Sequence, residues 1–326
     1  MRARRIVVAL VFVLLGARGV RAQADSCLRR SVPVNVVNDQ GQIVTGLTEN
    51  NFIGSMHHQP VKILSVTQDD SPRRVVIVLD ASGSMISEGS AWHQYLAVAH
   101  NLIAAMPSEA LAGLVVFSSK VDKNIPLSES RDDLQDELNA LREGRKALPK
   151  GERLTAIWDA LATADAEFDS HQEGDAIYAI TDGGENASKL KMNSLRKTLL
   201  EKRIRLFTYV GFTFIGGPEF NGGLDLIDLS DATGGVGIST RRNDVGMLPA
   251  LAYGSGKPTP EGELLMAQYR QIFSFQRMEI QLPKALDKPQ EWILKVTGTK
   301  AKDLTVVYPH KLAGCSKPAQ GAAAKR

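Results

Sequence analysis

The chain has 326 residues, 43% of them hydrophobic, and a formal net charge of +3. This length suits two domains and allows a sizeable hydrophobic core. The small net charge argues against a nucleic-acid-binding protein or a polybasic membrane-binding surface. The doublets Arg73-Arg74 and Arg241-Arg242 are therefore interpreted as solvated flanks of strands and loops.

Residues 1–22 have the layout of a secretory signal peptide. Met1–Arg5 is basic, Ile6–Gly16 is apolar, and small residues follow near Ala22. The apolar run is shorter than the roughly 20 residues that span a bilayer, so an uncleaved anchor is the weaker alternative. No later stretch predicts a membrane span, and we expect a secreted or periplasmic protein. Five of the 39 basic residues and none of the 36 acidic ones lie in this leader, so its removal makes the net charge slightly negative.

The chain contains two cysteines, Cys27 and Cys315, near its two ends. An exported protein meets an oxidising compartment, where an even number of cysteines favours a disulfide. Two free thiols are the alternative. A bond between them would tie the ends of the protein together and close a very long loop.

Residues 27–70 have the chemistry of a β segment. Val32, Val34 and Val36 alternate with other residues, which predicts a strand with one buried face. Pro33 has no N–H to donate to a neighbouring strand, so this strand is predicted to lie at the edge of its sheet.

Residues 264–312 are predicted to form a second β segment, which pairs with the first into a small β domain. The residues 313–326 are low in complexity and predict a disordered tail. The strand-like runs of this second segment are Met278–Leu282, Trp292–Val296 and Leu304–Tyr308.

Between the two β segments, residues 73–255 alternate between strand and helix patterns. This alternation predicts an α/β domain with a doubly wound, mostly parallel sheet and helices on both faces, in a Rossmann-like arrangement. The α/β domain is thus expected to be inserted between the N- and C-terminal β segments. Its clearest buried strands are Val75–Asp80, Leu114–Phe117, Ala176–Thr181 and Ile204–Val210.

Oxygen-bearing side chains gather at the ends of these strands. Asp80, Ser82 and Ser84 follow the first buried strand, Asp182 follows a later one, and Thr155 begins a helix after a loop. The carboxyl ends of parallel strands meet at one edge of the sheet, where α/β proteins bind their ligands. Hydroxyl and carboxylate oxygens suit a hard divalent cation such as Mg²⁺. In the simpler alternative, the serine hydroxyls only cap the next helix.

These three segments resemble the metal-ion-dependent adhesion site (MIDAS) of the von Willebrand factor A (VWFA) domain family. The matching residues are Asp80-x-Ser82-x-Ser84, Thr155, and Asp182 in a Thr-Asp-Gly sequence. The resemblance implies that the two serines and the threonine bind Mg²⁺ directly, with Mn²⁺ or Ca²⁺ as alternatives. It implies that the two aspartates often act through water.

The resemblance extends over about Arg73–Leu251. It is nearest to the bacterial secreted "VWFA-related" proteins, which also carry a leading segment like Val32–Phe52. Close counterparts of Val44-Thr45-Gly46-Leu47 and of Asn51-Phe52 occur in that leading segment.

The resemblance implies a non-enzymatic adhesion module that binds a protein partner. Neutral hydroxyls and water-screened carboxylates leave Mg²⁺ much of its positive charge, so a partner's Asp or Glu can complete its coordination. The alternatives are a metal-dependent hydrolase, in which Asp80 and Asp182 hold the metal, and a structural envelope protein with an inactive site. His57-His58 is interpreted as a plain turn, because no third ligand lies at a useful spacing.

Overall fold

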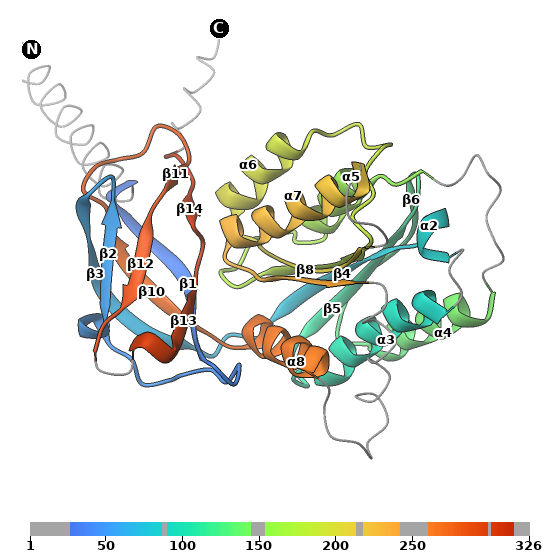
Figure 1. Ribbon diagram of the computed structural model, residues 1–326, viewed down its shortest axis with the longest axis horizontal. Helices are drawn as coiled ribbons and strands as arrows, with labels where there is room; N and C mark the ends of the chain where they lie inside the picture. Colours follow the sequence, from blue (N-terminus) through green and yellow to red (C-terminus); the bar gives the residue numbers. More distant parts are fainter. Residues whose placement is uncertain are drawn as a thin grey trace, which may run out of the picture.

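The computed structural model describes residues 27–86, 90–144, 154–212, 218–241, 260–298 and 301–315. The predicted leader and the part of the predicted tail from residue 316 onward lie outside these ranges. The described residues form an α/β domain and a β domain, which lie side by side (Figure 1). Within the described residues, no helix combines the length and the apolar character needed to cross a bilayer.

The α/β domain is built on a six-stranded sheet in the order β6-β5-β4-β7-β8-β9. All neighbours are parallel except β6, which runs antiparallel to β5. The central strand β4 is buried on both faces, because it lies between two layers of helices. Its run of consecutive β-branched residues suits this position. The strands are β4 (Arg74–Asp80), β5 (Leu111–Phe117), β6 (Val121–Ser128), β7 (Ala176–Thr181), β8 (Arg205–Phe212) and β9 (Gly237–Arg241).

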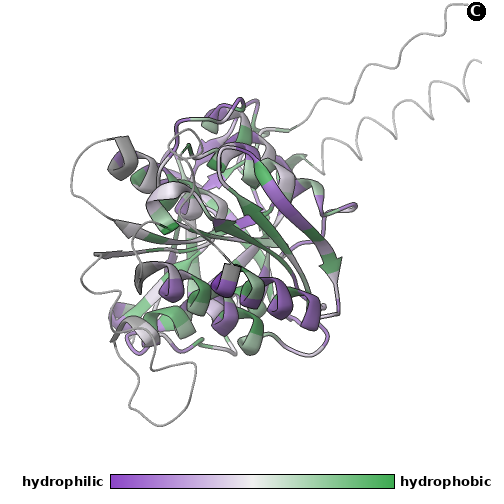
Figure 2. Ribbon diagram, turned by 90° about the vertical axis from the view of Figure 1, so that its right-hand side faces the viewer, coloured by the Kyte–Doolittle hydropathy of each residue, from purple (hydrophilic) through white to green (hydrophobic). Residues whose placement is uncertain are grey.

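Helices cover both faces of this sheet. One face packs against α3, α4 and α8, and the other packs against α5, α6 and α7. Figure 2 shows hydrophobic strands at the centre of the domain and hydrophilic stretches on the helices around them. The helices are α2 (Gly83–Ile86), α3 (Ser90–Ala105), α4 (Asp132–Gly144), α5 (Ile157–Ala166), α6 (Met192–Lys202), α7 (Pro218–Thr233) and α8 (Pro260–Phe273).

The β domain combines strands from both ends of the chain, in the order β12-β2-β3-β10-β1-β13. Its core lies between the strands and contains Val34, Met278 and Trp292. The predicted fold class, an α/β domain inserted between two β segments that pair, is confirmed. The strands of this sheet are β1 (Arg29–Asn38), β2 (Phe52–Met56), β3 (Gln59–Asp69), β10 (Phe275–Gln281), β12 (Ile293–Val296) and β13 (Leu304–Val307). Two short strands, β11 (Gln290–Glu291) and β14 (Lys311–Leu312), form a separate pair. Two short 3₁₀ helices are η1 (Glu49–Asn51) and η4 (Ala301–Asp303).

The structure differs from the sequence predictions at three places. Strand β1 is not an edge strand, since it lies between β10 and β13. However, β13 pairs only with residues 35–38, so the part of β1 that contains Pro33 has one neighbour and tolerates the missing N–H. The β segment expected from residue 264 begins at Phe275, because the preceding residues form α8 in the α/β core. Residues 313–315 of the expected tail are ordered, and the Cys315 N–H donates to the Leu286 carbonyl.

The two domains meet at a cluster of buried ion pairs, which overturns the interpretation of Arg73 and Arg74 as solvated. Arg73 is 5% exposed and donates to Asp69 at 2.7 Å. Arg74 is 9% exposed and binds both carboxylate oxygens of Asp175, at 2.8 and 2.6 Å. Arg205, which is 1% exposed, donates to the last carbonyls of α8 and to Gly174. Arg73 pairs with an aspartate four positions away, Arg74 pairs with a distant aspartate, and Arg205 donates to backbone carbonyls, so each buried charge is compensated by hydrogen bonds.

Asp69 is the acceptor that this junction depends on. Burial alone would raise the pKa of Asp69, but hydrogen bonds from Ser71 and Arg73 and the charge of Arg73 hold it well below its usual range. Arg277 of β10 also donates to this carboxylate. Asp69 therefore stabilises the fold above the pKa it has in the unfolded chain, about 3.9, and this contribution is lost as the pH falls below that value.

We predict that Asp69→Asn lowers the free energy of unfolding at pH 7 by about 3 kcal/mol, because it leaves buried arginines without their charge partner. The difference between wild type and variant should shrink as the pH is lowered below 4, since Asp69 then takes up a proton in the unfolded wild type while the folded state still holds the charged form. Urea unfolding at pH 7, 5, 4 and 3 measures both quantities. A difference that stays constant over this range would contradict the assignment.

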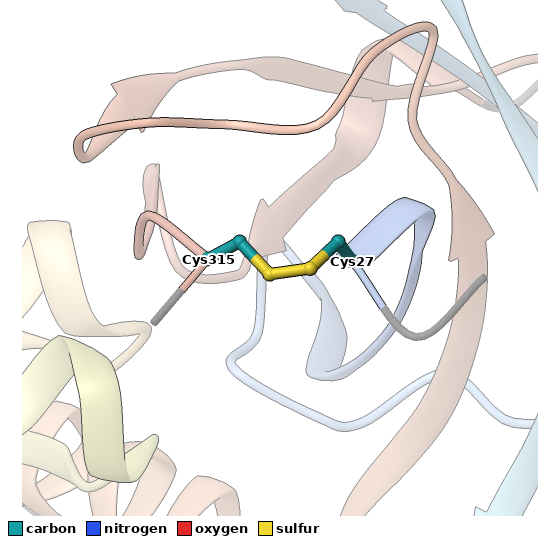
Figure 3. The surroundings of a disulfide bond; sticks show 2 residues. All are labelled: Cys27 and Cys315. Atoms are coloured by element: carbon teal, nitrogen blue, oxygen red, sulfur yellow. A yellow bond between two sulfur atoms is a disulfide. The ribbon is translucent and has the colours of Figure 1, made fainter. Parts of the chain in front are cut away.

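The predicted disulfide between Cys27 and Cys315 is present, with 5.6 Å between the two Cα atoms. Figure 3 shows the bond where the first and last described segments of the chain meet. The two residues are 288 positions apart in sequence. The bond therefore closes almost the whole described chain into one loop, which restricts the unfolded state.

We predict that the double variant Cys27→Ser/Cys315→Ser loses about 2–4 kcal/mol of unfolding free energy. Denaturant unfolding with and without a reducing agent measures the loss. Reduction should destabilise the wild type by a similar amount and leave the double variant unchanged. Equal effects of the reducing agent on both proteins would show that the bond does not stabilise the fold.

Candidate functional site

The candidate site lies where the strand order of the α/β sheet reverses. The chain runs from β4 to β5 on one side and later returns to β7 on the other side of β4. The carboxyl ends of β4 and β7 therefore lie next to each other, and loops from the two sides diverge there. Asp80 is the last residue of β4, and Thr181 is the last residue of β7.

Asp80 is fully buried and is held by two hydrogen bonds. The Ser82 backbone N–H donates to its Oδ1 at 2.8 Å, and the Thr181 hydroxyl donates to its Oδ2 at 2.6 Å. Thr181 Oγ1 also accepts from the Gly183 N–H at 3.0 Å. Gly183 has φ +90°, a conformation that favours glycine. The Thr181 hydroxyl thus joins the end of β4 to the turn after β7.

The two serines of the motif lie at the start of α2. Ser82 is fully buried, and its Oγ lies 3.1 Å from the Oγ of Ser84, with which it shares a hydrogen bond. Ser82 also holds the helix, because its carbonyl accepts from the Ile86 N–H at 3.2 Å. Capping and a ligand role are therefore compatible: the helix uses the backbone of Ser82, and the two hydroxyls contact each other.

Thr155 is held by its backbone, which leaves its hydroxyl available for binding. Its N–H donates to Asn186 Oδ1 at 2.8 Å, and its carbonyl accepts from the N–H groups of Asn186 and Ala187 at 3.0 and 3.1 Å. The side chain of Thr155 is 2% exposed. A Cβ on Gly184 would lie 3.2 Å from Thr155 Oγ1 and 3.2 Å from Asp182 Oδ1. Glycine at 184 therefore lets the threonine hydroxyl and the carboxylate of Asp182 approach each other.

Asp182 has one carboxylate oxygen without a partner. Its Oδ1 accepts from the Gly184 N–H at 3.0 Å. Its Oδ2 is buried and has no hydrogen-bond partner among the described residues, although the side chain is only 1% exposed. A buried carboxylate oxygen without a hydrogen bond is costly, so this atom indicates a site for a positively charged ligand.

Asp80 and Asp182 oppose each other electrostatically. Burial raises the pKa of Asp80, the charge of Asp182 raises it further, and hydrogen bonds from Thr181 and Ser82 lower it, with a resulting pKa of about 7. Two carboxylates that share a buried site disfavour each other's ionisation, and a bound cation would relieve this repulsion.

The donor set fits a hard cation better than a transition metal. The described residues contain no group of three or more His, Cys, Asp or Glu side chains that could bind a metal. The candidate site instead offers two carboxylates and three hydroxyls, which are hard oxygen ligands. The five residues predicted from the sequence lie in two groups. Asp80, Ser82 and Ser84 form the first group, and Thr155 and Asp182 form the second. The two groups are close enough that the charge of Asp182 raises the pKa of Asp80.

Sequence reasoning missed the residues that hold the ligands in place. Thr181 had a signal, because it ends a buried strand directly before Asp182. No sequence pattern indicates Asn186, because its contact with Thr155 spans 31 positions and depends on the tertiary structure. Glu185 accepts from the Trp158 N–H at the start of α5 and from the Ser188 hydroxyl, so it fixes the same loop.

Residues 75–185 match the family model of the von Willebrand factor type A domain. The match contains β4, β7 and all five candidate ligands, and the sheet around it has the corresponding doubly wound arrangement. The α/β domain is a von Willebrand factor type A (VWA) domain. The match covers about a third of the chain, so the β domain lies outside it.

Several solved structures are similar to this chain. The conserved hypothetical protein BatB from Bacteroides thetaiotaomicron is 17% identical, with 60% of this chain and 96% of that chain covered and a TM-score of 0.43. A von Willebrand factor type A protein from Catenulispora acidiphila is 11% identical, with 88% and 74% covered and a TM-score of 0.46. Proximal thread matrix protein 1 from the mussel byssus, solved with a zinc-occupied MIDAS motif, is 15% identical, with 57% and 49% covered and a TM-score of 0.41. A search of curated proteins finds no match.

We predict that Asp182→Asn raises the melting temperature of the VWA domain in EDTA by about 2–4 °C. The amide keeps an acceptor for the Gly184 N–H but removes the charge that opposes Asp80. Differential scanning calorimetry in EDTA measures the shift, and Asp303→Asn, at an exposed position in the β domain, is the matched control. A variant that melts below the wild type in EDTA would contradict the proposed repulsion.

Proposed function

We propose that the protein is a secreted, non-enzymatic binding module whose VWA domain recognises a protein partner through a divalent cation, with Mg²⁺ preferred. The observation that carries this proposal is the buried, unpartnered Oδ2 of Asp182 beside the buried carboxylate of Asp80. The VWA domains are a family of protein-interaction modules, which supports the same class of function.

The five candidate ligands would hold the cation with different roles. Ser82, Ser84 and Thr155 offer neutral hydroxyls as direct ligands, and Asp80 and Asp182 supply the negative charge, in part through water. When bound, the cation supplies a positively charged coordination position that an Asp or Glu of the partner can occupy. Because the direct ligands are neutral and the two carboxylates act in part through water, the cation keeps much of its positive charge at the open position, which favours an anionic partner.

The composition of the site also supports a binding role over hydrolysis. A hydrolytic metal centre needs a tightly held metal and a general base that activates water. This site has only two carboxylates, and three of their four oxygens already accept hydrogen bonds from backbone and threonine donors. We therefore propose that the partner's carboxylate, and not a substrate undergoing reaction, meets the cation.

The disulfide between Cys27 and Cys315 supports the proposal of secretion. Disulfides form and persist in oxidising compartments outside the cytosol. The pair joins the two ends of the β domain and is consistent with the leader predicted at residues 1–22.

We predict that millimolar Mg²⁺ or Mn²⁺ raises the melting temperature of the wild type, since a ligand that binds the folded state stabilises it by about 2.7 kcal/mol at 100 times its Kd. Thr155→Val should abolish most of this rise, because Thr155 is anchored through its backbone and loses only the hydroxyl. Asp303→Asn should retain the full rise. A melting curve of the wild type that is unchanged by either metal would contradict the cation site.

The partner is tested by affinity capture from the native envelope, in Mg²⁺ and in EDTA. We expect a protein that is captured in Mg²⁺, released by EDTA and not captured by Thr155→Val. Capture that is indifferent to EDTA would contradict recognition through the cation. Turnover of generic phosphoester or peptide substrates in Mg²⁺, lost in Thr155→Val, would instead establish a hydrolase.

A further inference from the structure

Two adjoining cavities form a groove between the two domains, apart from the cation site. Helix α7 connects the parallel strands β8 and β9, so its last turns lie near the amino ends of the strands, opposite to the candidate ligands. One cavity, of about 520 Å³, lies at these last turns, and the other, of about 450 Å³, lies along α6. His57, Glu291 and Lys311 of the β domain line both, so the cavities adjoin, and we call them together the interdomain groove.

Hydrogen bonds hold the two walls of the interdomain groove together. The His310 N–H of the β domain donates to the carbonyl of Asp231 in α7 at 3.2 Å, and the His310 carbonyl accepts from the Trp292 N–H at 3.2 Å. Each cavity has a volume within the roughly 300–1,000 Å³ that is typical of ligand-binding clefts. The groove is therefore preformed, so a ligand would lose little affinity to ordering of the protein.

Charged side chains are segregated along the interdomain groove. Histidines aside, the described wall along α6 has four basic residues and one acidic residue, and the wall at the end of α7 has three acidic residues and one lysine. The basic end is formed by Arg196, Lys197, Lys288 and the shared Lys311, and the acidic end by Asp228, Asp231 and the shared Glu291. A ligand that spans the groove would therefore meet opposite charges at its two ends.

Two ion pairs lie within the groove, and both are exposed. Arg196 pairs with Asp228 at 2.7 Å, and Lys311 pairs with Glu291 at 3.4 Å. The acidic side chains of these pairs are 61% and 76% exposed. Solvent screens exposed ion pairs and makes them weak, so the charged groups of a docking partner can compete with them.

Each end of the groove also has a charged side chain without an ion pair. With the described residues, neither Lys288 at the basic end nor Asp231 at the acidic end forms an ion pair within 4.0 Å. Burial raises the pKa of Asp231, the nearby His310 lowers it, and the charge of Asp228 raises it again, with a raised pKa as the result. An ammonium or guanidinium group beside Asp231 would relieve this unfavourable charge.

An exposed apolar surface continues from the acidic end of the groove. Among the described residues of the β domain, the exposed large hydrophobic side chains are Ile53, which is 61% exposed, and Ile293, which is 53% exposed. Ile293 pairs with Ser55 and Lys295 pairs with Ile53, so the two isoleucines are diagonal neighbours on one face of β12 and β2. Ser55 and Ile293 also line the acidic cavity, so this apolar face adjoins the groove.

We propose that the interdomain groove is a docking site for an extended segment of a partner protein. The segment carries an acidic residue beside Lys288, a basic residue beside Asp231 and an apolar residue on Ile293 and Ile53, in this order along the groove. A polypeptide fits better than a small molecule, because a chain presents different side chains at successive positions. The proposal does not depend on the cation site of the VWA domain.

The probe is a random linear peptide library displayed on phage and selected on the full chain in EDTA, so that the cation site stays empty. We expect the enriched peptides to share an acidic, a basic and an apolar residue, in this order or in the reverse order. An enriched peptide is then synthesised, and isothermal titration calorimetry measures its Kd. Its binding should weaken as the salt concentration rises, because salt screens the charges at both ends of the groove.

Charge reversal locates the site. Asp231→Lys should weaken binding of the enriched peptide at least tenfold, and a peptide with glutamate in place of its basic residue should recover part of this loss. Lys288→Glu should weaken binding in the same way at the other end. The matched control is Asp225→Lys, because Asp225 is an exposed acidic residue of α7 that does not line the groove. Circular dichroism and the melting temperature without peptide verify that each variant is folded.

The apolar contact is tested separately. Ile293→Ser should weaken binding of the enriched peptide severalfold, and a peptide with serine in place of its apolar residue should bind this variant and the wild type with similar Kd. Because Ile293 is exposed, its replacement should leave the melting temperature nearly unchanged.

Several results would overturn the proposal. A selection that enriches no shared pattern, or a pattern without a basic residue, would show that the groove does not read such a segment. Unchanged binding in the folded variants Asp231→Lys and Lys288→Glu would place the peptide elsewhere. A dimer of the full chain in analytical ultracentrifugation that is lost in Asp231→Lys would assign the groove to a second copy of the chain.

Discussion

The structure of the VWA domain depends on the burial of two carboxylates at one edge of its sheet. Asp80 and Asp182 are 0% and 1% exposed, and the charge of Asp182 raises the pKa of Asp80. Backbone N–H groups and the Thr181 hydroxyl compensate part of the cost, but Asp182 Oδ2 has no hydrogen-bond partner in the described part of the chain. Such a buried pair lowers the stability of the fold at this point, which is typical of functional sites.

The surrounding fold makes this arrangement possible by fixing three distant segments. Strands β4 and β7 are neighbours in the sheet, so the ends that carry Asp80 and Asp182 cannot separate. The loop with Thr155 is connected to the same place through the side chain and backbone of Asn186. Helix α7 also packs closely against the turn after β7, because a Cβ on Gly222 of α7 would lie only 2.2 Å from the carbonyl oxygen of Gly183. This contact restricts the position of the turn.

The β domain and the VWA domain are joined by buried arginines from several segments. Arg73 and Arg205 both donate to carbonyls at the end of α8, directly before the chain enters β10. Arg73 and Arg277 converge on Asp69 at the end of β3. The inserted domain is therefore held at both of its chain connections.

The sequence alone predicted the central strands of the α/β sheet, since runs of apolar, mostly β-branched residues such as Val75–Leu79 are typical of parallel strands buried on both faces. It also indicated the five candidate ligands, because they lie where those strands and loops end. Only the tertiary structure decided that Pro33 has one neighbour, that residues 264–273 are helical, and that Arg73 and Arg74 are buried. The unpartnered oxygen of Asp182 belongs to this second group as well. Each of these features depends on contacts between residues far apart in sequence, and local pattern carries no information about the partner that a buried charge finds or lacks.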